Sequence, residues 1–140
     1  IDGFGIGVNL AASVDVPALD CAYKLQEYAG APKRKLSEGK ATWPGRKQVW
    51  RVYDADGQMR GDVLSLETDK QPGEALIVPV MRGGKRVAAA PTLSQIRDRA
   101  AADLARLPAP LRRLDVFDYP VDVSDALKSL AQEARPPTRR

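Results

Sequence analysis

The chain has 140 residues, of which 44% are hydrophobic and 29% are charged, and its net charge is +4. This length and balance predict one soluble globular domain with a hydrophobic core and exclude a disordered chain. No apolar run approaches the ~20 residues of a membrane-spanning helix, and the first residues lack the basic and apolar stretches of a secretion signal. Residues 1–4 contain no initiator Met and are typical of the interior of a longer protein.

Two residue types that often carry chemistry are scarce. The single cysteine, Cys21, excludes an internal disulfide and a cysteine-rich zinc site, and it is typical of a small buried side chain. The absence of histidine excludes a Ser-His-Asp triad, a histidine-ligated metal and an imidazole base from this chain. A self-contained hydrolase is therefore not expected, and the cysteine usage favours a cytoplasmic location.

Three glycines in five positions form the motif at residues 3–7. They weaken both helix and strand, so we expect a loop. Successive glycines let backbone amides converge on an anion, as in the phosphate loops that follow the last strands of barrel enzymes. The spacing differs from the G-x-G-x-x-G dinucleotide fingerprint. On this motif alone, a phosphate-binding loop and a flexible turn both remain open.

Short segments with strand character follow, separated by turn signals. The predicted strands are residues 23–28, a start at 34–37, 48–53, 59–67 and the apolar run 75–81. The predicted turns are residues 30–32, 43–45, 54–57, 71–73 and 82–85. Asp54 and Asp56 are interpreted as turn formers, because a calcium loop would need more oxygen ligands at fixed spacing. This part of the chain therefore predicts a meander of short strands.

The pattern changes to helical periodicity after Pro91. Thr92 and Gln95 have the spacing of a capping box, in which each side chain satisfies a free amide at the helix start. Apolar residues at helical spacing then predict a core-facing stripe of Leu93, Ile96, Ala100, Leu104 and Leu107.

The prolines at residues 108 and 110 end this helix, and residues 119–123 are expected to be extended. Ser124 can cap a last helix, whose predicted inward residues are Leu127, Leu130, Ala131 and Ala134. The predicted fold class is α+β, with short strands first and two helices last.

Basic residues are concentrated between positions 33 and 51, where one acid, Glu38, accompanies Lys33, Arg34, Lys35, Lys40, Arg46, Lys47 and Arg51. Such an excess indicates an anionic partner, which could be phosphate, nucleic acid or an acidic surface of the same protein, or else a solvated face. Trp43 and Trp50 would suit base stacking, but they would equally suit a sheet core or a subunit interface.

Four segments resemble the C-terminal part of nicotinate phosphoribosyltransferases. They are DGFGIGVNL at residues 2–10, DVPALDCAYKL at 15–25, KLSEGK at 35–40 and PGRKQVWR at 44–51. The resemblance implies a cytoplasmic NAD-salvage enzyme that joins nicotinate to 5-phosphoribosyl 1-pyrophosphate, giving nicotinate mononucleotide and pyrophosphate. It also implies coupled ATP hydrolysis, Mg²⁺ as a cofactor, a homodimer, and no membrane or nucleic-acid partner.

The same resemblance implies an architecture and a set of site residues. The family is a type II phosphoribosyltransferase, an irregular α/β barrel with a second domain. Its pattern divides this chain into the glycine loop and barrel exit (1–20), a β-rich region (21–90), a C-terminal helical region (91–135) and a tail (136–140). Gly5, Gly7 and the amide of Val8 would contact the substrate phosphate, although the family commonly has threonine where this chain has Val8.

The resemblance makes Lys40, Arg46 and Lys47 candidates for a substrate or interface loop. It assigns no catalytic residue to this chain, because the family's histidine and most of its substrate-binding arginines lie upstream of Ile1. We therefore expect the 140-residue chain alone to be inactive. The alternative hypothesis is a non-catalytic, basic, β-rich module that binds nucleic acid or a protein.

Overall fold

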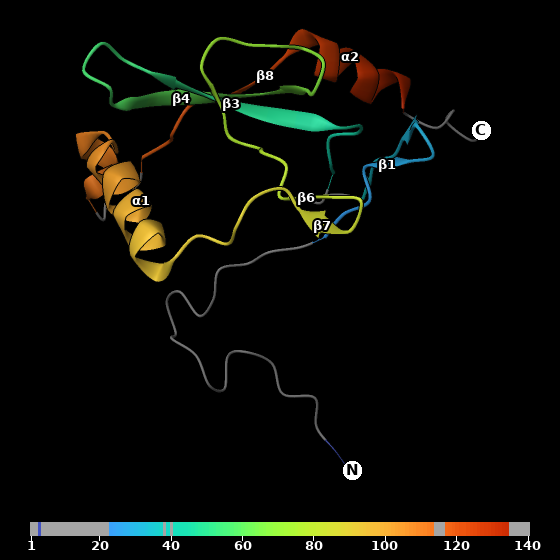
Figure 1. The fold of residues 1–140 in the computed structure, drawn as a ribbon. Coiled ribbons are helices and arrows are strands. Elements are labelled where there is room, and N and C mark those ends of the chain that lie inside the picture. The colour runs from blue at the N-terminus through green and yellow to red at the C-terminus, as the bar shows by residue number, and fades with distance from the viewer. Residues whose placement is uncertain (1–2, 4–22, 38, 40, 114–116, 135–140) are drawn as a thin grey trace.

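The computed structural model describes residues 3, 23–37, 39, 41–113 and 117–134. At its centre is a four-stranded sheet with the strand order β5-β3-β4-β8 (Figure 1). Its strands are β3 (Lys47–Tyr53), β4 (Met59–Leu66), β5 (Glu74–Ala75) and β8 (Val121–Val123). β3 pairs antiparallel with both β4 and β5, and β8 is parallel to β4.

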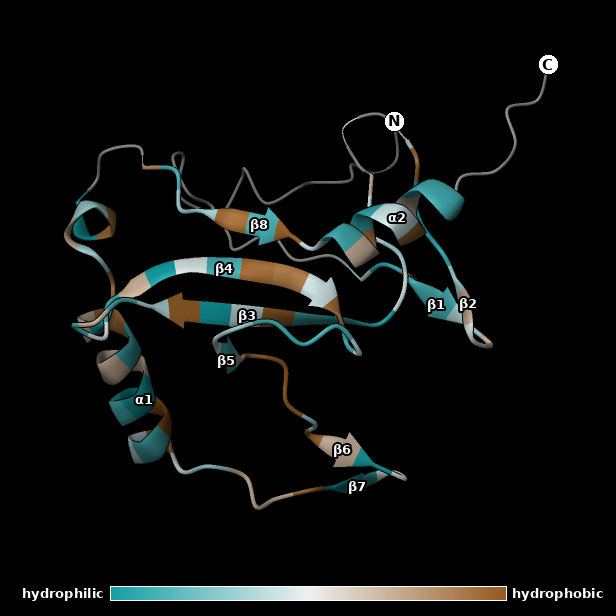
Figure 2. Cartoon of the chain, turned by 90° about the horizontal axis from the view of Figure 1, so that it is seen from above, coloured by the Kyte–Doolittle hydropathy of each residue, from teal (hydrophilic) through white to brown (hydrophobic). Residues whose placement is uncertain are grey.

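The remaining elements surround this sheet. Two small hairpins are formed by β1 (Glu27–Tyr28) with β2 (Ala31–Pro32), and by β6 (Met81–Arg82) with β7 (Lys85–Arg86). The helices are α1 (Leu93–Ala105), the short 3₁₀ helix η2 (Ala109–Arg112) and α2 (Asp125–Glu133). α1 and α2 lie at opposite ends of the sheet (Figures 1 and 2). Strands and helices together confirm a mixed α+β region, and none of the described helices has the length and apolar content to cross a membrane.

The β3–β4 hairpin forms where the sequence predicts two strands and a turn. The carboxylate of Asp54 accepts hydrogen bonds from the amides of Asp56 and Gln58, at 3.0 and 2.8 Å, so it closes the turn on its own backbone. Gly57 supplies the positive φ, +76°, that the turn requires. These contacts confirm that Asp54 is a turn former.

α2 covers one end of the sheet and provides most of the apolar core of the described residues. Ser124 caps the helix by accepting a hydrogen bond from the amide of Leu127. Leu127 is fully buried and Ala131 is nearly so, as the sequence predicts. Arg34 donates to the carbonyl of Ala131, which places a cation at the end of the helix where the backbone dipole favours positive charge.

Several strand predictions are wrong. Only Glu27–Tyr28 of the predicted strand 23–28 is a strand, and residues 34–37 and 76–80 form no strand. The predicted turn at 30–32 lies one residue earlier: Ala29 and Gly30 both have positive φ, the geometry of a tight two-residue hairpin turn, so residues 31–32 pair instead. Alternating polarity indicates a half-exposed strand but does not provide a pairing partner.

α1 has the predicted start but not the predicted environment. Thr92 and Gln95 form the capping box, since each side chain bonds the backbone amide of the other residue. However, no residue of α1 is buried, and Leu93 and Leu104 are 80% and 62% exposed. The prediction that this stripe faces the core is wrong for the described structure, because no described element covers it.

A close backbone approach at Gly73 fixes the position of β5. Gly73 has φ +116°, and a Cβ atom there would lie 2.4 Å from the carbonyl oxygen of Arg51. Only glycine tolerates both the conformation and the contact.

We predict that Gly73→Ala lowers the free energy of unfolding by about 3 kcal/mol, because it adds a backbone clash to a left-handed conformation. The matched control is Gly84→Ala, where φ is +75° and no atom lies within 4 Å, so the cost should be only about 1 kcal/mol. Urea unfolding of both variants measures the difference, and equal losses would contradict it.

Candidate functional site

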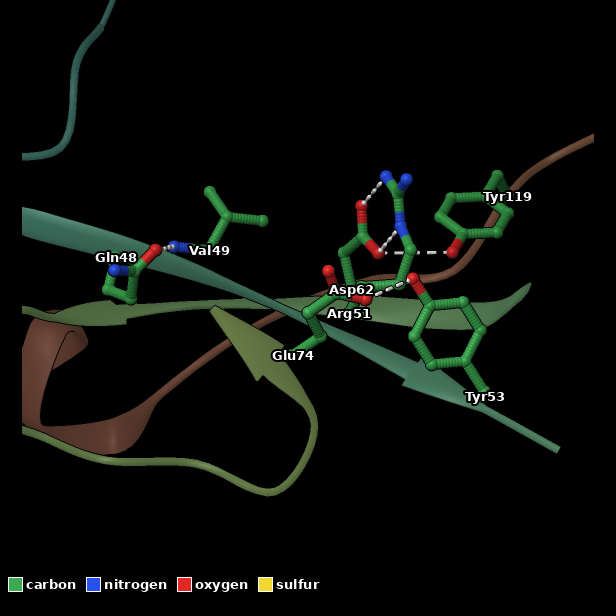
Figure 3. Close-up of polar contacts among 7 residues, drawn as sticks. All are labelled: Gln48, Val49, Arg51, Tyr53, Asp62, Glu74 and Tyr119. Carbon is green, nitrogen blue, oxygen red and sulfur yellow. Dashed lines mark hydrogen bonds and ion pairs between the residues drawn. The ribbon is translucent and has the colours of Figure 1, made fainter. Parts of the chain in front are cut away.

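A row of charged side chains crosses the middle of the sheet. The register places Arg51 of β3 opposite Asp62 of β4 and opposite Glu74 of β5, so the three side chains share one face. Arg51 Nε and Nη2 donate to the two carboxylate oxygens of Asp62 at 2.9 and 2.8 Å (Figure 3). Tyr119, just before β8, donates its hydroxyl to Asp62 Oδ1 at 3.1 Å. The carboxylate therefore has three hydrogen bonds from two elements.

These contacts favour the charged form of Asp62 and the neutral form of Tyr119. The hydrogen bonds from Arg51 hold the pKa of Asp62 below its usual value, against the opposing effect of burial. Burial and the hydrogen bond to Asp62 raise the pKa of Tyr119. At neutral pH, Asp62 is ionised and Tyr119 keeps its proton. The arrangement therefore stabilises a fixed charge pair and is not suited to transferring protons.

A second polar cluster connects the same sheet to the end of α1. Tyr53 donates its hydroxyl to Glu74 Oε2 at 2.7 Å. The guanidinium carbon of Arg106, the residue that caps the C-terminus of α1, lies 3.6 Å from the centroid of the Tyr53 ring, a cation–π contact. The backbone carbonyl of Arg106 accepts the amide of Met59 at 2.8 Å. Side-chain and backbone contacts thus hold the end of α1 against the β3–β4 hairpin.

An open groove of about 530 Å³ lies between α1 and this charged row. Its lining residues are Arg51, Met59, Asp62, Ala100, Asp103, Leu104, Leu107, Leu111 and Tyr119. The helix side is mainly apolar, whereas the sheet side carries the Arg51–Asp62 pair. The groove can therefore accept apolar groups beside a fixed ion pair, and we treat it as the candidate functional site of the described residues.

Of the residues predicted from sequence to contact substrate, the two that the structure describes, Arg46 and Lys47, do not line this groove. Gly5, Gly7, Val8 and Lys40 are outside the described residues. Arg46, whose side chain is 72% exposed, donates from Nε to Glu27 Oε1 at 3.1 Å.

Lys47 is turned toward its own loop. Its ammonium group donates to the carbonyls of Trp43 and Gly45, at 2.9 and 2.5 Å. Burial lowers the pKa of Lys47, partly opposed by the charge of Glu27. Arg46 and Lys47 therefore both lie near the β1–β2 hairpin, and both side chains have hydrogen-bond partners within the chain.

Other members of the basic segment also have internal partners. Arg34 bonds to α2, and Arg51 is paired with Asp62. Trp50 is half-buried in the sheet and donates from its indole nitrogen to the buried hydroxyl of Ser65 at 2.9 Å. These contacts favour structural roles for Arg34, Arg51 and Trp50 over a surface for nucleic acid.

The Arg51–Asp62–Tyr119 cluster was not predicted from the sequence. Two of its members could have been found, because a hairpin with strands at 48–53 and 59–67 and a turn at 54–57 places Arg51 close to opposite Asp62. Tyr119 gives no such signal, since its approach depends on the parallel pairing of β8 with β4.

Comparison with known proteins shows the family. Residues 72–131 match the model of the nicotinate phosphoribosyltransferase C-terminal domain. These residues form such a domain. The chain is 45% identical over 130 residues to nicotinate phosphoribosyltransferase pncB2 of Mycobacterium tuberculosis strain H37Rv, covering 91% of this chain and 28% of that relative. It is 39% identical over 89 residues to the nicotinate phosphoribosyltransferase of Dictyostelium discoideum, covering 62% and 15%.

A solved structure gives the same result. The crystal structure of human nicotinic acid phosphoribosyltransferase matches with a TM-score of 0.70 and 25% identity, over 80% of this chain and 26% of the human chain. This nicotinate phosphoribosyltransferase C-terminal region thus spans little more than a quarter of the M. tuberculosis relative and of the human structure.

We predict that Asp62→Asn lowers the free energy of unfolding at pH 7 by roughly 2 kcal/mol, because it removes the charged acceptor of Arg51. Since the folded-state pKa of Asp62 is depressed, its contribution is present above the ordinary aspartate pKa of about 3.9 and is lost as the pH falls through the lower folded value. The difference in the free energy of unfolding between wild type and variant should therefore become smaller as the pH falls toward 3.

Chemical unfolding at pH 7 and pH 3 measures this narrowing. Asp122→Asn, at an exposed position on β8, is the matched control and should have little effect at either pH. A difference that is equally large at both pH values would contradict an ionised Asp62 as the source of the stability.

Proposed function

We propose that this chain belongs to a full-length nicotinate phosphoribosyltransferase of NAD salvage. The enzyme joins nicotinate to 5-phosphoribosyl 1-pyrophosphate and releases nicotinate mononucleotide and pyrophosphate, with coupled ATP hydrolysis. The observation that carries the proposal is the 45% identity to the M. tuberculosis enzyme across nine tenths of this chain. The activity is assigned to the whole protein, because the chain spans only 28% of that relative.

Within that enzyme, we assign the described residues a supporting role. Their main polar cluster is the Arg51–Asp62 ion pair with Tyr119. At neutral pH the carboxylate is ionised and the phenol is protonated, so neither group is ready to transfer a proton. The described residues contain no group of three His, Cys, Asp or Glu side chains placed to hold a metal ion. We propose that the Mg²⁺ and ATP sites lie in the remainder of the enzyme.

The glycine loop is our proposed contact with the phosphate of 5-phosphoribosyl 1-pyrophosphate. Departure of pyrophosphate builds positive charge at the anomeric carbon of the ribose, so fixed hydrogen-bond donors that hold the substrate in place favour the reaction. Gly5, Gly7 and the amide of Val8 would supply such donors, because glycine leaves the backbone accessible.

For the basic loop, we propose that Arg46 contacts substrate or the neighbouring subunit of a cytoplasmic homodimer, together with Lys40. The exposed guanidinium of Arg46 supports this assignment. We assign Lys47 a structural role, because its hydrogen bonds to the carbonyls of Trp43 and Gly45 hold the loop that carries Arg46.

We predict that the purified full-length protein forms nicotinate mononucleotide from nicotinate, 5-phosphoribosyl 1-pyrophosphate, ATP and Mg²⁺, and that the 140-residue chain does not. Chromatographic detection of the mononucleotide is the measurement, with omission of 5-phosphoribosyl 1-pyrophosphate as the blank. An inactive but folded full-length protein would refute the proposed function. Turnover by the 140-residue chain would refute the supporting role.

We predict that Gly7→Ala in the full-length enzyme raises the KM for 5-phosphoribosyl 1-pyrophosphate about tenfold, the equivalent of about 1.4 kcal/mol, because a methyl group obstructs the phosphate. The KM for nicotinate should not change. Gly3→Ala is the control, because Gly3 has open space around it. Val8→Thr should lower the same KM by adding a hydroxyl donor. Steady-state kinetics that show equal effects on both substrates would exclude the loop as the phosphate contact.

A further inference from the structure

The chain between β5 and the end of α1 has an unusual surface. Every residue from Ile77 to Ala105 is exposed. Its large exposed apolar side chains are Ile77, Val78, Val80, Met81, Val87, Leu93, Ile96 and Leu104. We call residues 77–105 the apolar segment. In Figure 2 it forms an arm that leaves the sheet after β5 and returns along α1.

This segment lacks the contacts that normally hold such elements. A 13-residue helix is marginal in water by itself, and a hairpin of two-residue strands has no stability of its own. In the part of the chain that the structure describes, the helix contacts the sheet near its C-terminal end, where Arg106 contacts Tyr53 and Met59. Many large apolar side chains exposed along one segment indicate a surface that another part of a protein covers.

We infer that the apolar segment is the docking surface on which the remaining part of the full-length chain packs. The inference rests on the proposed membership of a longer transferase chain, but it does not depend on catalytic activity. The groove beside Leu104 and Leu107 gives this surface a hollow for an apolar side chain of the covering part.

Two observations favour the same chain over a second copy as the occupant. The fold of this chain recurs, with a TM-score of 0.70, inside a human chain of which it covers 26%, so a much larger body is attached to a closely similar region. The matched C-terminal domain, residues 72–131, contains the whole apolar segment. A packing partner within one chain is always present, whereas a second copy depends on concentration.

The charges on the segment define the chemistry of the covering surface. Its cations are Arg82, Lys85, Arg86, Arg97 and Arg99, whereas its acids are Asp98 and Asp103. The complementary surface is therefore apolar at its centre and acidic at its rim.

Hydrogen–deuterium exchange on the full-length protein tests the inference. We expect the amides of residues 95–105 to exchange at least ~100-fold more slowly than in an unstructured peptide, far beyond the protection of a marginal isolated helix. This protection should not change on dilution. Leu104→Glu should reduce it at least tenfold, because the substitution places a charge in the covered face. Ala102→Glu, on the opposite side of the same helix, should leave it intact.

Each outcome decides the inference. Fast exchange in the wild-type protein, or equal effects of the two glutamates, would show that nothing covers α1. Protection that disappears on dilution would assign the surface to a second copy and overturn the inference. Assaying the same samples separates the two proposals: an active enzyme with an unprotected α1 refutes only the docking surface, and a protected α1 without activity refutes only the proposed function.

Discussion

The contact between Arg51 and Asp62 lies where three strands of the sheet and the segment before β8 meet. The two residues are paired across β3 and β4, and Arg51 is also paired with Glu74 on β5. Tyr119 brings the segment before β8 to the same carboxylate. Partial burial of a charge pair is costly, and a pair that lacked further hydrogen bonds would contribute little. Here the two parallel hydrogen bonds from Arg51 and a third from Tyr119 satisfy Asp62, so the pair fixes the register of the sheet and the position of β8 together.

Few apolar side chains are buried in the described residues. Leu127 and Ala131 of α2 are buried at one end of the sheet, and Met59 of β4 is buried beside the groove that Arg51 and Asp62 line. Pro44, before β3, is also fully buried. Ser65 is also fully buried, but its hydroxyl accepts from Trp50 and lies 2.7 Å from the carbonyl oxygen of Asp69. With so few apolar side chains buried, satisfied polar contacts and glycine-specific backbone contacts determine much of the arrangement.

What could be predicted from the sequence follows from how local each signal is. The two helix caps, the turn at Asp54 and the buried side of α2 depend on residues within a few positions of one another, and all were predicted. The strands predicted at residues 23–28 and 34–37 were mostly wrong, because alternating polarity does not show whether a segment has a strand to pair with. The phosphate contacts of Gly5 and Gly7 remain a prediction, since both residues lie outside the described part of the chain.

The apolar stripe on α1 is another case in which a local sequence pattern does not identify the packing partner. Helical spacing of Leu93, Ile96 and Leu104 indicates that this face needs cover, but it does not indicate which part of a protein provides it. The predicted stripe is correct as a pattern and wrong as a statement about the core of the described residues.

This exposed face also bears on the ion pair. Leu104 lines one wall of the groove, and Arg51 and Asp62 line the other. Under the docking proposed above, packing against Leu104 would remove water from the same groove and lower the effective dielectric around the pair. A satisfied ion pair then attracts more strongly, whereas an unpaired charge becomes more costly. Loss of Asp62 should therefore destabilise the full-length protein more than the 140-residue chain. The ion pair and the apolar segment would act as one unit, in which covering by the rest of the enzyme strengthens the contact that holds the sheet together.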